Sequence, residues 1–248
     1  MNEDLELSIV IPAHNEVAVI KDTLLSLYSR LEMEQLSFEL VVVNDNSSDG
    51  TTEILDELCT VNQRIRRIDN NPPNGFGFAV RCGLDAAVGK YVAIMMADAS
   101  DDPDDVVKFF RMAEQEGLDA VFGNRFAKGG EVIDYPLLKL CFNRLTNWII
   151  ALLFAVRYTD TSNAFKLYRQ DTLEGLKPYL SHHFNFTVEL PLKVIVRGYS
   201  YGVLPNRWTN RKFGESKLKI KEMGSRYLFI ILYCLIEKWL SVGDYRKL

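Results

Sequence analysis

The most informative segment of this chain is Val41-Val42-Val43-Asn44-Asp45-Asn46-Ser47-Ser48-Asp49-Gly50-Thr51. In it, a run of β-branched residues leads directly into short polar side chains and a glycine. This order is typical of a buried parallel strand that delivers polar side chains to the carboxyl edge of an α/β sheet, where such folds bind ligands. We therefore predict a strand that ends in a ligand site.

Two other stretches repeat this pattern. They are Leu7-Ser8-Ile9-Val10-Ile11-Pro12-Ala13-His14-Asn15-Glu16 and Tyr91-Val92-Ala93-Ile94-Met95-Met96-Ala97-Asp98. Because the carboxyl ends of parallel strands meet at one edge of a sheet, three strands that end in acids or amides predict one shared polar site.

Residues 1–130 alternate between strand and helix periodicities. We expect strands near residues 6–12, 39–45, 65–69, 90–98 and 119–123, and helices over residues 17–31, 51–61, 78–87 and 103–116. Such alternation predicts an α/β fold with a doubly wound, mostly parallel, Rossmann-like sheet. A chain of 248 residues, 48% of them hydrophobic, can bury the core of one large domain of this kind, with or without an appendage.

The pattern changes after Arg125. We expect a helix over 136–156, a short strand over 164–169, a helix over 186–197 and a strand over 199–209, followed by a basic loop and an apolar helix. We predict that residues 1–215 form the main domain, with a nucleotide-binding half (1–130) and an acceptor-binding half (131–215). Residues 216–248 are expected to form a peripheral pair of amphipathic helices.

The net charge of −4 gives no reason to expect nucleic-acid binding, but the charge is unevenly distributed. Residues 98–105 contain five aspartates, whereas residues 207–226 contain seven Lys or Arg and two Glu. An anionic pocket that faces a cationic segment suits a phosphorylated substrate bound through a metal ion.

The cysteines and the apolar segments bear on location. Four cysteines lie far apart without a CxxC pair, which indicates free thiols in a reducing compartment. The acidic N-terminus runs straight into the first strand and is not expected to act as a signal peptide. The apolar segments 148–156 and 227–236 are each too short to cross a bilayer, which takes about 20 residues. They fit core helices, dimer helices or helices on a membrane surface, and we favour membrane contact.

The best candidates for metal ligands are Asp98 and then Asp101. Hard cations such as Mg²⁺ and Mn²⁺ bind carboxylate oxygens together with substrate phosphates. The neighbouring Asp102-Pro103-Asp104-Asp105 is typical of a helix start, with an N-cap, a proline in the first position and acids in the first turn. We therefore assign Asp102, Asp104 and Asp105 mainly to helix initiation.

Two motifs lie near the predicted nucleotide. Asp45, at a strand end, can accept hydrogen bonds from a base or a ribose hydroxyl, whereas Asp49 before Gly50-Thr51 is better explained as a helix cap. The glycines of Gly75-Phe76-Gly77 can let the backbone approach a ligand at a helix start, although a plain turn explains them equally well.

Three further groups leave alternatives open. Arg211 and Lys217 flank a flexible glycine and can clamp a diphosphate, with a solvated basic loop as the alternative. Asp160 and Glu189 are acids among apolar residues, and each fits an acceptor-binding group or a satisfied buried carboxylate equally well. The pair His182-His183 is typical of a surface loop.

Taken in order, these motifs resemble the GT-A glycosyltransferases of family 2, and among them the dolichyl- and polyprenyl-phosphate mannose or glucose synthases. The matching residues are Ile9 to Glu16, Val42 to Thr51, Gly75-Phe76-Gly77 with Gly83, Gly123-Asn124-Arg125, Asp160 to Lys166, Glu189, and Arg211 to Lys217. Relatives commonly have a DxD-type triplet at the metal, whereas this chain has Ala97-Asp98-Ala99-Ser100-Asp101. Asn44 also stands where many relatives have an aspartate.

The resemblance implies a role for each matching residue. The implied donor-binding residues are Pro12, Ala13, Asn15, Glu16, Asn44, Asp45, Gly75, Asp98, Arg125, Arg211, Ser216 and Lys217. The implied acceptor-binding residues are Asp160, Ser162, Asn163 and Glu189, and the implied catalytic residues are Asp98, Asp160 and Arg211.

The activity implied is transfer of a sugar, with inversion, from a GDP- or UDP-sugar to a polyprenyl phosphate, assisted by Mg²⁺ or Mn²⁺. The protein is then expected at the cytoplasmic face of a membrane, bound peripherally, and the apolar helices leave room for a homo-oligomer. The acceptor phosphate hardly needs a general base, because its second pKa of about 6 leaves it largely dianionic. One alternative is a family 2 enzyme with a soluble or polysaccharide acceptor. The other is a non-enzymatic assembly subunit with a degenerate metal site.

Overall fold

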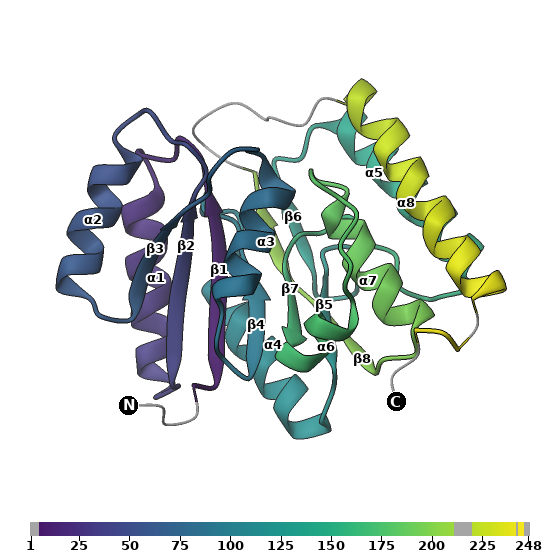
Figure 1. The fold of residues 1–248 in the computed structure, drawn as a ribbon, viewed down its shortest axis with the longest axis horizontal. Coiled ribbons are helices and arrows are strands. Elements are labelled where there is room, and N and C mark those ends of the chain that lie inside the picture. Colours follow the sequence, from purple (N-terminus) through teal and green to yellow (C-terminus); the bar gives the residue numbers. More distant parts are fainter. Residues whose placement is uncertain (1–4, 211–219, 242, 246–248) are drawn as a thin grey trace.

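A seven-stranded sheet forms the centre of the computed structural model, which describes residues 5–210, 220–241 and 243–245 (Figure 1). The strand order is β3-β2-β1-β4-β7-β5-β8. These strands are β1 (Leu7–Ala13), β2 (Phe38–Asn44), β3 (Ile65–Asp69), β4 (Tyr91–Ile94), β5 (Ala120–Asn124), β7 (Lys166–Arg169) and β8 (Tyr201–Pro205). A separate two-stranded sheet pairs β6 (Glu131–Ile133) with β9 (Arg207–Thr209).

The sheet is mostly parallel, as predicted. Strands β3, β2, β1 and β4 are parallel neighbours, and β5 is parallel to β8. Strand β7 lies between β4 and β5 and is antiparallel to both. Every residue of β1 and β2 is buried, which explains why both read as continuous apolar runs.

Helices cover both faces of the sheet, because alternate residues of each strand point to opposite sides. Ile9 and Ile11 of β1 belong to one core and Val10 to the other. The first core includes residues of α1 (Ile20–Met33), α2 (Thr51–Val61) and α4 (Pro103–Glu116). The second core includes residues of α3 (Phe76–Ala86), α6 (Gln170–Gly175) and α7 (Phe186–Val196).

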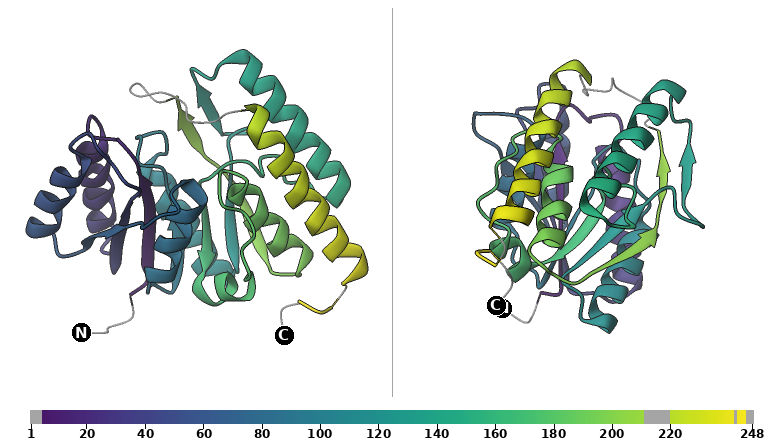
Figure 2. Two further views of the ribbon diagram at one scale, coloured as in Figure 1. Left: turned by 45° about the horizontal axis from the view of Figure 1, so that its top comes forward. Right: turned by 90° about the vertical axis from the view of Figure 1, so that its right-hand side faces the viewer.

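A third layer consists of α5 (Leu137–Phe154) and α8 (Ile220–Leu240). The two helices run side by side along one flank of the molecule (Figures 1 and 2). Ile150 of α5, Leu192 of α7 and Ile230 of α8 belong to one apolar cluster that joins this layer to the domain.

Helix α3 approaches the sheet closely at Gly83. A Cβ atom there would lie 2.3 Å from Cγ1 of Val10 and 2.9 Å from Cγ2 of Val43. Only glycine fits at this distance, so the position is fixed by helix-to-sheet packing.

Two sequence-based predictions for the C-terminal third are wrong. The strand expected over 199–209 is interrupted at the buried Asn206, whose side chain binds Asn163, so that β8 and β9 enter different sheets. The described part of residues 216–248 contains one helix, α8, instead of a pair. Strand β6 and helix α6 were not anticipated.

Candidate active site

The loops that follow β1 and β2 are joined by hydrogen bonds at the carboxyl edge of the sheet. The backbone N–H of Asn15 donates to Ser47 Oγ at 3.1 Å, and the N–H of Ser48 donates to Asn15 Oδ1 at 2.7 Å. Glu16 donates its N–H to Thr51 Oγ1 at 2.9 Å. The predicted residues Asn15 and Glu16 therefore lie against the loop that carries Asp45. The predicted residues Pro12 and Ala13, just before them, are buried.

The loop after β2 also contains the predicted helix cap. Asp49 Oδ1 accepts the N–H of Thr51, the first residue of α2, at 3.1 Å, and Asp49 Oδ2 accepts the N–H of Val17. Asp49 thus satisfies an exposed N–H group at the start of α2, as predicted, although the N-cap residue itself is Gly50.

Asp45 is buried and organises the segment before α3. Its Oδ1 accepts hydrogen bonds from the side-chain amides of Asn70 at 2.7 Å and Asn74 at 3.0 Å, and its Oδ2 accepts the N–H of Gly75 at 2.9 Å. Gly75 has a φ of +138°, which favours glycine over any residue with a Cβ atom. Asp45 and Gly75 thus form one unit, although they are distant in sequence.

Asn44 connects the ends of β2, β3 and α2. Its Nδ2 donates to Asp69 Oδ1 at 2.9 Å and to Thr52 Oγ1 at 3.2 Å, while its Oδ1 accepts the N–H of Ser47. An amide suits this position because its Nδ2 can donate to the Asp69 carboxylate, which an ionised aspartate could not do. The side chain predicted to bind donor is therefore engaged by protein groups.

An acidic cluster follows β4. Asp98, Ser100 and Asp101 are all buried. Burial raises the pKa of Asp101, the N–H of Met96 and the charge of Arg125 lower it, and the nearby Asp98 raises it, so that the pKa lies at about 7. Ser100 Oγ is buried and has no hydrogen-bond partner within the described residues. The cluster thus offers two carboxylates and one unsatisfied hydroxyl.

The next residues start α4, as predicted. Asp102 caps the helix by accepting the N–H of Asp104, and Pro103 occupies the first helical turn. Asp105 does more than initiate the helix, since its Oδ2 accepts the N–H of Arg207 at 2.8 Å.

Strand β9 runs along this acidic segment. Thr209 donates its N–H to the carbonyl of Ser100 at 3.0 Å, and Trp208 forms an isolated bridge with Asp101. The predicted residues Arg211, Ser216 and Lys217 lie outside the described residues. Thr209, which lies beside the acidic cluster, is two residues before Arg211 in the sequence.

Arg125 and Asp160 form a buried ion pair. Arg125 Nη2 donates to Asp160 Oδ1 at 2.7 Å, and Arg125 Nε and its backbone N–H donate to Oδ2 at 2.9 and 3.0 Å. Asp160 raises the pKa of Arg125 against the effect of burial. Asp160 is fully buried, so it is Arg125 that faces open space, with the rings of Tyr135 and Trp208 near its guanidinium.

The other predicted acceptor residues differ in their surroundings. Ser162 is partly exposed, and its Oγ accepts hydrogen bonds from Asn143 and Asn147 of α5. Asn163 is buried and donates to the carbonyl of Gly123 and to Asn206.

Glu189 lies away from any open surface. It is fully buried, and it accepts hydrogen bonds from the N–H groups of Leu180 and Ser181 and from Lys193 Nζ at 2.6 to 2.7 Å. This geometry fits the satisfied-carboxylate alternative for Glu189.

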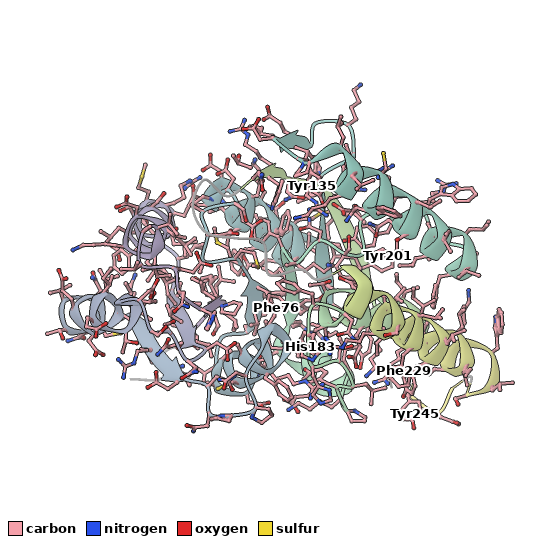
Figure 3. All side chains as sticks on the ribbon, turned by 90° about the horizontal axis from the view of Figure 1, so that it is seen from above. Phe76, Tyr135, His183, Tyr201, Phe229 and Tyr245 are labelled. Atoms are coloured by element: carbon pink, nitrogen blue, oxygen red, sulfur yellow. The ribbon has the colours of Figure 1, made fainter. Side chains whose placement is uncertain are left out.

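Two adjoining cavities extend from Arg125 toward α5. One, of about 560 Å³, is lined by residues that include Arg125, Tyr135 and Arg144. The other, of about 400 Å³, lies between α5 and α8 and is lined mainly by apolar side chains, with Lys139, Asn143 and Ser162 among its polar groups. Tyr135 lines both cavities, and the view from above shows it beside α5 (Figure 3).

Tyr135, Lys139, Asn143 and Arg144 were not predicted from the sequence as site residues. The available signal was a ladder of polar residues at a spacing of four, Lys139, Asn143 and Asn147, on an otherwise apolar helix. Such spacing places the three side chains on one face of a helix.

Helices α5 and α8 expose many large apolar side chains. On α5 they include Leu138, Trp148 and Leu152, and on α8 they include Phe229, Leu232 and Trp239. Helix α5 has 18 residues and a mean hydropathy of 1.4, so by length and composition alone it could cross a membrane, although the apolar segment 148–156 considered in the sequence is shorter than the helix. Asn143 and Asn147 nevertheless hydrogen-bond to the Thr161–Ser162 loop, which ties α5 to the domain.

Comparison with known proteins identifies the class. A family model described as glycosyl transferase family 2 matches residues 8–177. The chain belongs to this family and is a glycosyltransferase, as the motifs predicted.

Two characterised relatives are similar over most of this chain. A polyprenol monophosphomannose synthase of Mycolicibacterium smegmatis is 26% identical over 216 residues, which cover 85% of this chain and 80% of that protein. A dolichol-phosphate mannosyltransferase of Pyrococcus furiosus is 29% identical over 223 residues, 88% of this chain and 60% of that longer protein.

Solved structures agree on the fold. The crystal structure of glucosyl-3-phosphoglycerate synthase from Mycobacterium tuberculosis with Mn²⁺, UDP-glucose and phosphoglyceric acid has a TM-score of 0.71 and 16% identity, covering 93% of this chain and 79% of that one. A complex of the same enzyme with UDP has a TM-score of 0.70 and 17% identity, covering 93% and 80%. At this level of identity the likeness concerns the fold, and it supports the predicted GT-A architecture.

Proposed function

We propose that this glycosyltransferase moves a sugar from a GDP- or UDP-sugar to a polyprenyl phosphate, with inversion at the anomeric carbon. The observation that carries the proposal is the position of Arg125. Its guanidinium, held by Asp160, lies between the acidic cluster of Asp98 and Asp101 and the apolar cavity between α5 and α8. The names of both relatives, which are polyprenol- and dolichol-phosphate mannose enzymes, support this acceptor class.

The donor would bind along the carboxyl edge of β1, β2 and β4, which assigns it to the half of the domain formed by residues 1–130. Asp45 and the ordered Gly75 segment would contact the base or ribose, and the Asn15–Glu16 turn would line the same edge. Arg211, Ser216 and Lys217 remain proposed contacts of the diphosphate. Their segment follows β9, whose Thr209 is hydrogen-bonded beside the acidic cluster.

Asp98 and Asp101 would hold a divalent cation, Mg²⁺ or Mn²⁺. No group of three or more His, Cys, Asp or Glu side chains gathers as a metal site within the described residues. Two carboxylates still fit a cation whose remaining ligands are phosphate oxygens and water, and the unsatisfied Ser100 Oγ is an additional oxygen beside them. When bound there, the cation neutralises charge that develops on the leaving diphosphate.

The acceptor phosphate would bind between Arg125 and α5, in the half formed by residues 131–215. Arg125, Lys139 and Arg144 supply positive charge around the two cavities, and Asn143 and Ser162 supply hydrogen-bonding groups. Charged donors of this kind bind phosphate oxygens strongly. The apolar walls between α5 and α8 would accommodate the first isoprene units.

In this mechanism Arg125 binds the acceptor phosphate and Asp160 positions Arg125, and neither residue transfers a proton. Both oxygens of Asp160 accept hydrogen bonds from Arg125, so Asp160 is poorly placed to remove a proton and positions Arg125 instead. The acceptor phosphate is already largely dianionic at neutral pH, with a second pKa of about 6. The chain would therefore act by aligning a phosphate oxygen with the anomeric carbon, and in-line attack would invert that carbon.

The exposed apolar faces of α5 and α8 would rest on the cytoplasmic face of a membrane, where the acceptor lipid resides. Their side chains form a wide apolar surface rather than scattered single residues, which is typical of a site that contacts a membrane or a partner.

The test is the partition of a radiolabelled sugar. The protein is incubated with Mn²⁺, polyprenyl phosphate in detergent and a labelled GDP- or UDP-sugar, chosen by a thermal-shift screen of donors. We expect label in the organic phase that depends on the lipid phosphate. Label found only in a water-soluble product would contradict the proposal and favour a soluble acceptor.

A further inference from the structure

A second polar pocket lies outside the candidate active site. It occupies about 530 Å³ between the loop that precedes α7 and the first turns of α8. His182, His183 and Asn185 line it from the loop, and Ser225, Arg226 and Phe229 line it from α8. The mechanism proposed above uses none of these residues.

The charge of this pocket favours an anion. Arg226 carries a permanent positive charge, and the imidazoles and the serine hydroxyl can donate hydrogen bonds. Among the described lining residues there is no acid. The charges of Arg81 and Glu189 both act on the His182 imidazole, and Glu189 is itself buried in an ion pair with Lys193.

Asn185 indicates that the ligand carries a hydroxyl as well. Its side chain is 4% exposed, and its Nδ2 reaches the carbonyl oxygen of Arg226 at 3.5 Å. Its Oδ1 is buried and accepts no hydrogen bond within the described residues. A buried acceptor without a donor is costly, so a ligand hydroxyl would satisfy a group that the protein leaves unpaired.

The open side of the pocket is apolar. Phe229 is 58% exposed and belongs to the exposed apolar residues of α8, which also include Leu228, Leu232 and Trp239. A ligand seated here would therefore have its anionic group against Arg226 and an apolar portion along α8.

The walls of the pocket are held in place by α3. The ring of Phe184 stacks on Phe76 at 4.4 Å, and Gly77 allows the His182–His183 backbone to approach so closely that a Cβ atom would lie 2.5 Å from the carbonyl carbon of His182. From above, the labelled Phe76, His183 and Phe229 follow one another from α3 to α8 (Figure 3). The pocket is therefore preformed.

We propose that this pocket binds the headgroup of an anionic phospholipid, with Arg226 and His183 on the phosphate and Asn185 on a headgroup hydroxyl. The inference rests on the membrane-surface part of the proposed function. It adds a lipid site that is separate from the acceptor site at Arg125, and it would orient the molecule on the membrane.

The test is binding to vesicles by flotation, without sugar donor or polyprenyl phosphate. We expect the protein to bind phosphatidylcholine vesicles that contain phosphatidylglycerol about tenfold more tightly than phosphatidylcholine vesicles alone. Arg226→Gln and Asn185→Asp should abolish that preference while leaving binding to neutral vesicles unchanged. Arg111→Gln, which removes an exposed charge on α4, is the matched control and should keep the preference.

Three results would overturn the inference. The first is that the wild-type protein shows no preference for vesicles that contain phosphatidylglycerol. The second is that Arg111→Gln removes the preference as fully as Arg226→Gln does. The third is that Arg226→Gln or Asn185→Asp keeps the preference while its unfolding temperature equals that of the wild-type protein. If the wild-type protein shows no vesicle preference, and glycerol phosphate stabilises it but not Arg226→Gln, the pocket binds a soluble anion instead of a lipid. Sugar transfer in detergent should be normal in Arg226→Gln. The transfer assay therefore tests the proposed function independently of the vesicle assay, which tests the lipid site.

Discussion

The guanidinium of Arg125 and the carboxylate of Asp160 form a two-point ion pair in the interior, with N-to-O distances of 2.7 and 2.9 Å. The two residues are 35 positions apart, and the pair joins the end of β5 to the loop before β7. It leaves one face of the guanidinium toward the cavities beside α5 and fixes the direction of the remaining positive charge.

Replacing Asp160 with Asn should leave Arg125 as an unpaired buried charge. We expect a loss of about 3 to 5 kcal/mol in the free energy of unfolding, because breaking one half of a buried ion pair has this cost. In the folded fraction, the KM for polyprenyl phosphate should rise. Chemical denaturation and initial rates at varied acceptor concentration measure both effects. The control is Asp171→Asn, which removes an exposed partner of Arg169 and should change neither quantity.

Replacing Asp98 with Asn should abolish the stabilisation of the protein by donor plus Mn²⁺. Its carboxylate is a proposed ligand of the divalent cation, so transfer should fall as well, and EDTA should have the same effect on the wild-type protein. Asp102→Asn is the matched control. It affects a helix cap, so it should change stability by at most about 2 kcal/mol and leave the metal dependence intact. Full Mn²⁺-dependent stabilisation of Asp98→Asn would remove Asp98 from the metal site.

Replacing Glu189 with Gln should lower stability without raising the KM for acceptor. The side chain is buried against two backbone N–H groups and Lys193, so the variant leaves Lys193 as an unpaired buried cation. We expect a loss of about 3 to 5 kcal/mol. A stable variant with a raised acceptor KM would instead restore the acceptor-binding role expected from the sequence.

Replacing Gly83 with Ala should destabilise the protein by about 1 to 3 kcal/mol, because the added methyl group would press on Val10. The double variant with Val10→Ala should recover part of this loss. Gly224→Ala, where no heavy atom lies within 4 Å of the added methyl group, should be neutral or slightly stabilising. Equal stability of Gly83→Ala and the wild-type protein would refute the close-packing account of α3.

Replacing Leu152 with Glu should weaken binding to neutral phosphatidylcholine vesicles, because a charge would enter the apolar face of α5. Met33→Glu on α1 is the control, since Met33 is similarly exposed but lies on the opposite part of the fold. Equal vesicle binding by both variants would argue against membrane contact through α5. A dimer in solution that Leu152→Glu dissociates would indicate that the face binds a second copy.

Features with a local physical cause could be predicted from the sequence. The helices over 51–61 and 103–116 have the expected bounds because Asp49 and Asp102 cap them and Pro103 begins the second. The buried strands were recognisable because residues buried on both faces produce continuous β-branched runs.

Features that depend on distant contacts could not be predicted. The antiparallel placement of β7 depends on pairing with β4 and β5 far earlier in the chain. The engagement of Glu189 depends on a loop that folds back over α7. The pairing of Asp160 with Arg125 follows from the same long-range packing, so the sequence left the role of Asp160 undecided.

In the proposed function, the Arg125 guanidinium joins a nucleotide-sugar site to a lipid-phosphate site. The most direct measurement is a crystal structure with a nucleoside diphosphate, Mn²⁺ and a short-chain polyprenyl phosphate. We expect the diphosphate beside Asp98 and the acceptor phosphate within hydrogen-bonding distance of Arg125, with its chain between α5 and α8. A fully occupied complex with the lipid phosphate elsewhere, and Arg125 without contact to either ligand, would contradict the proposed function.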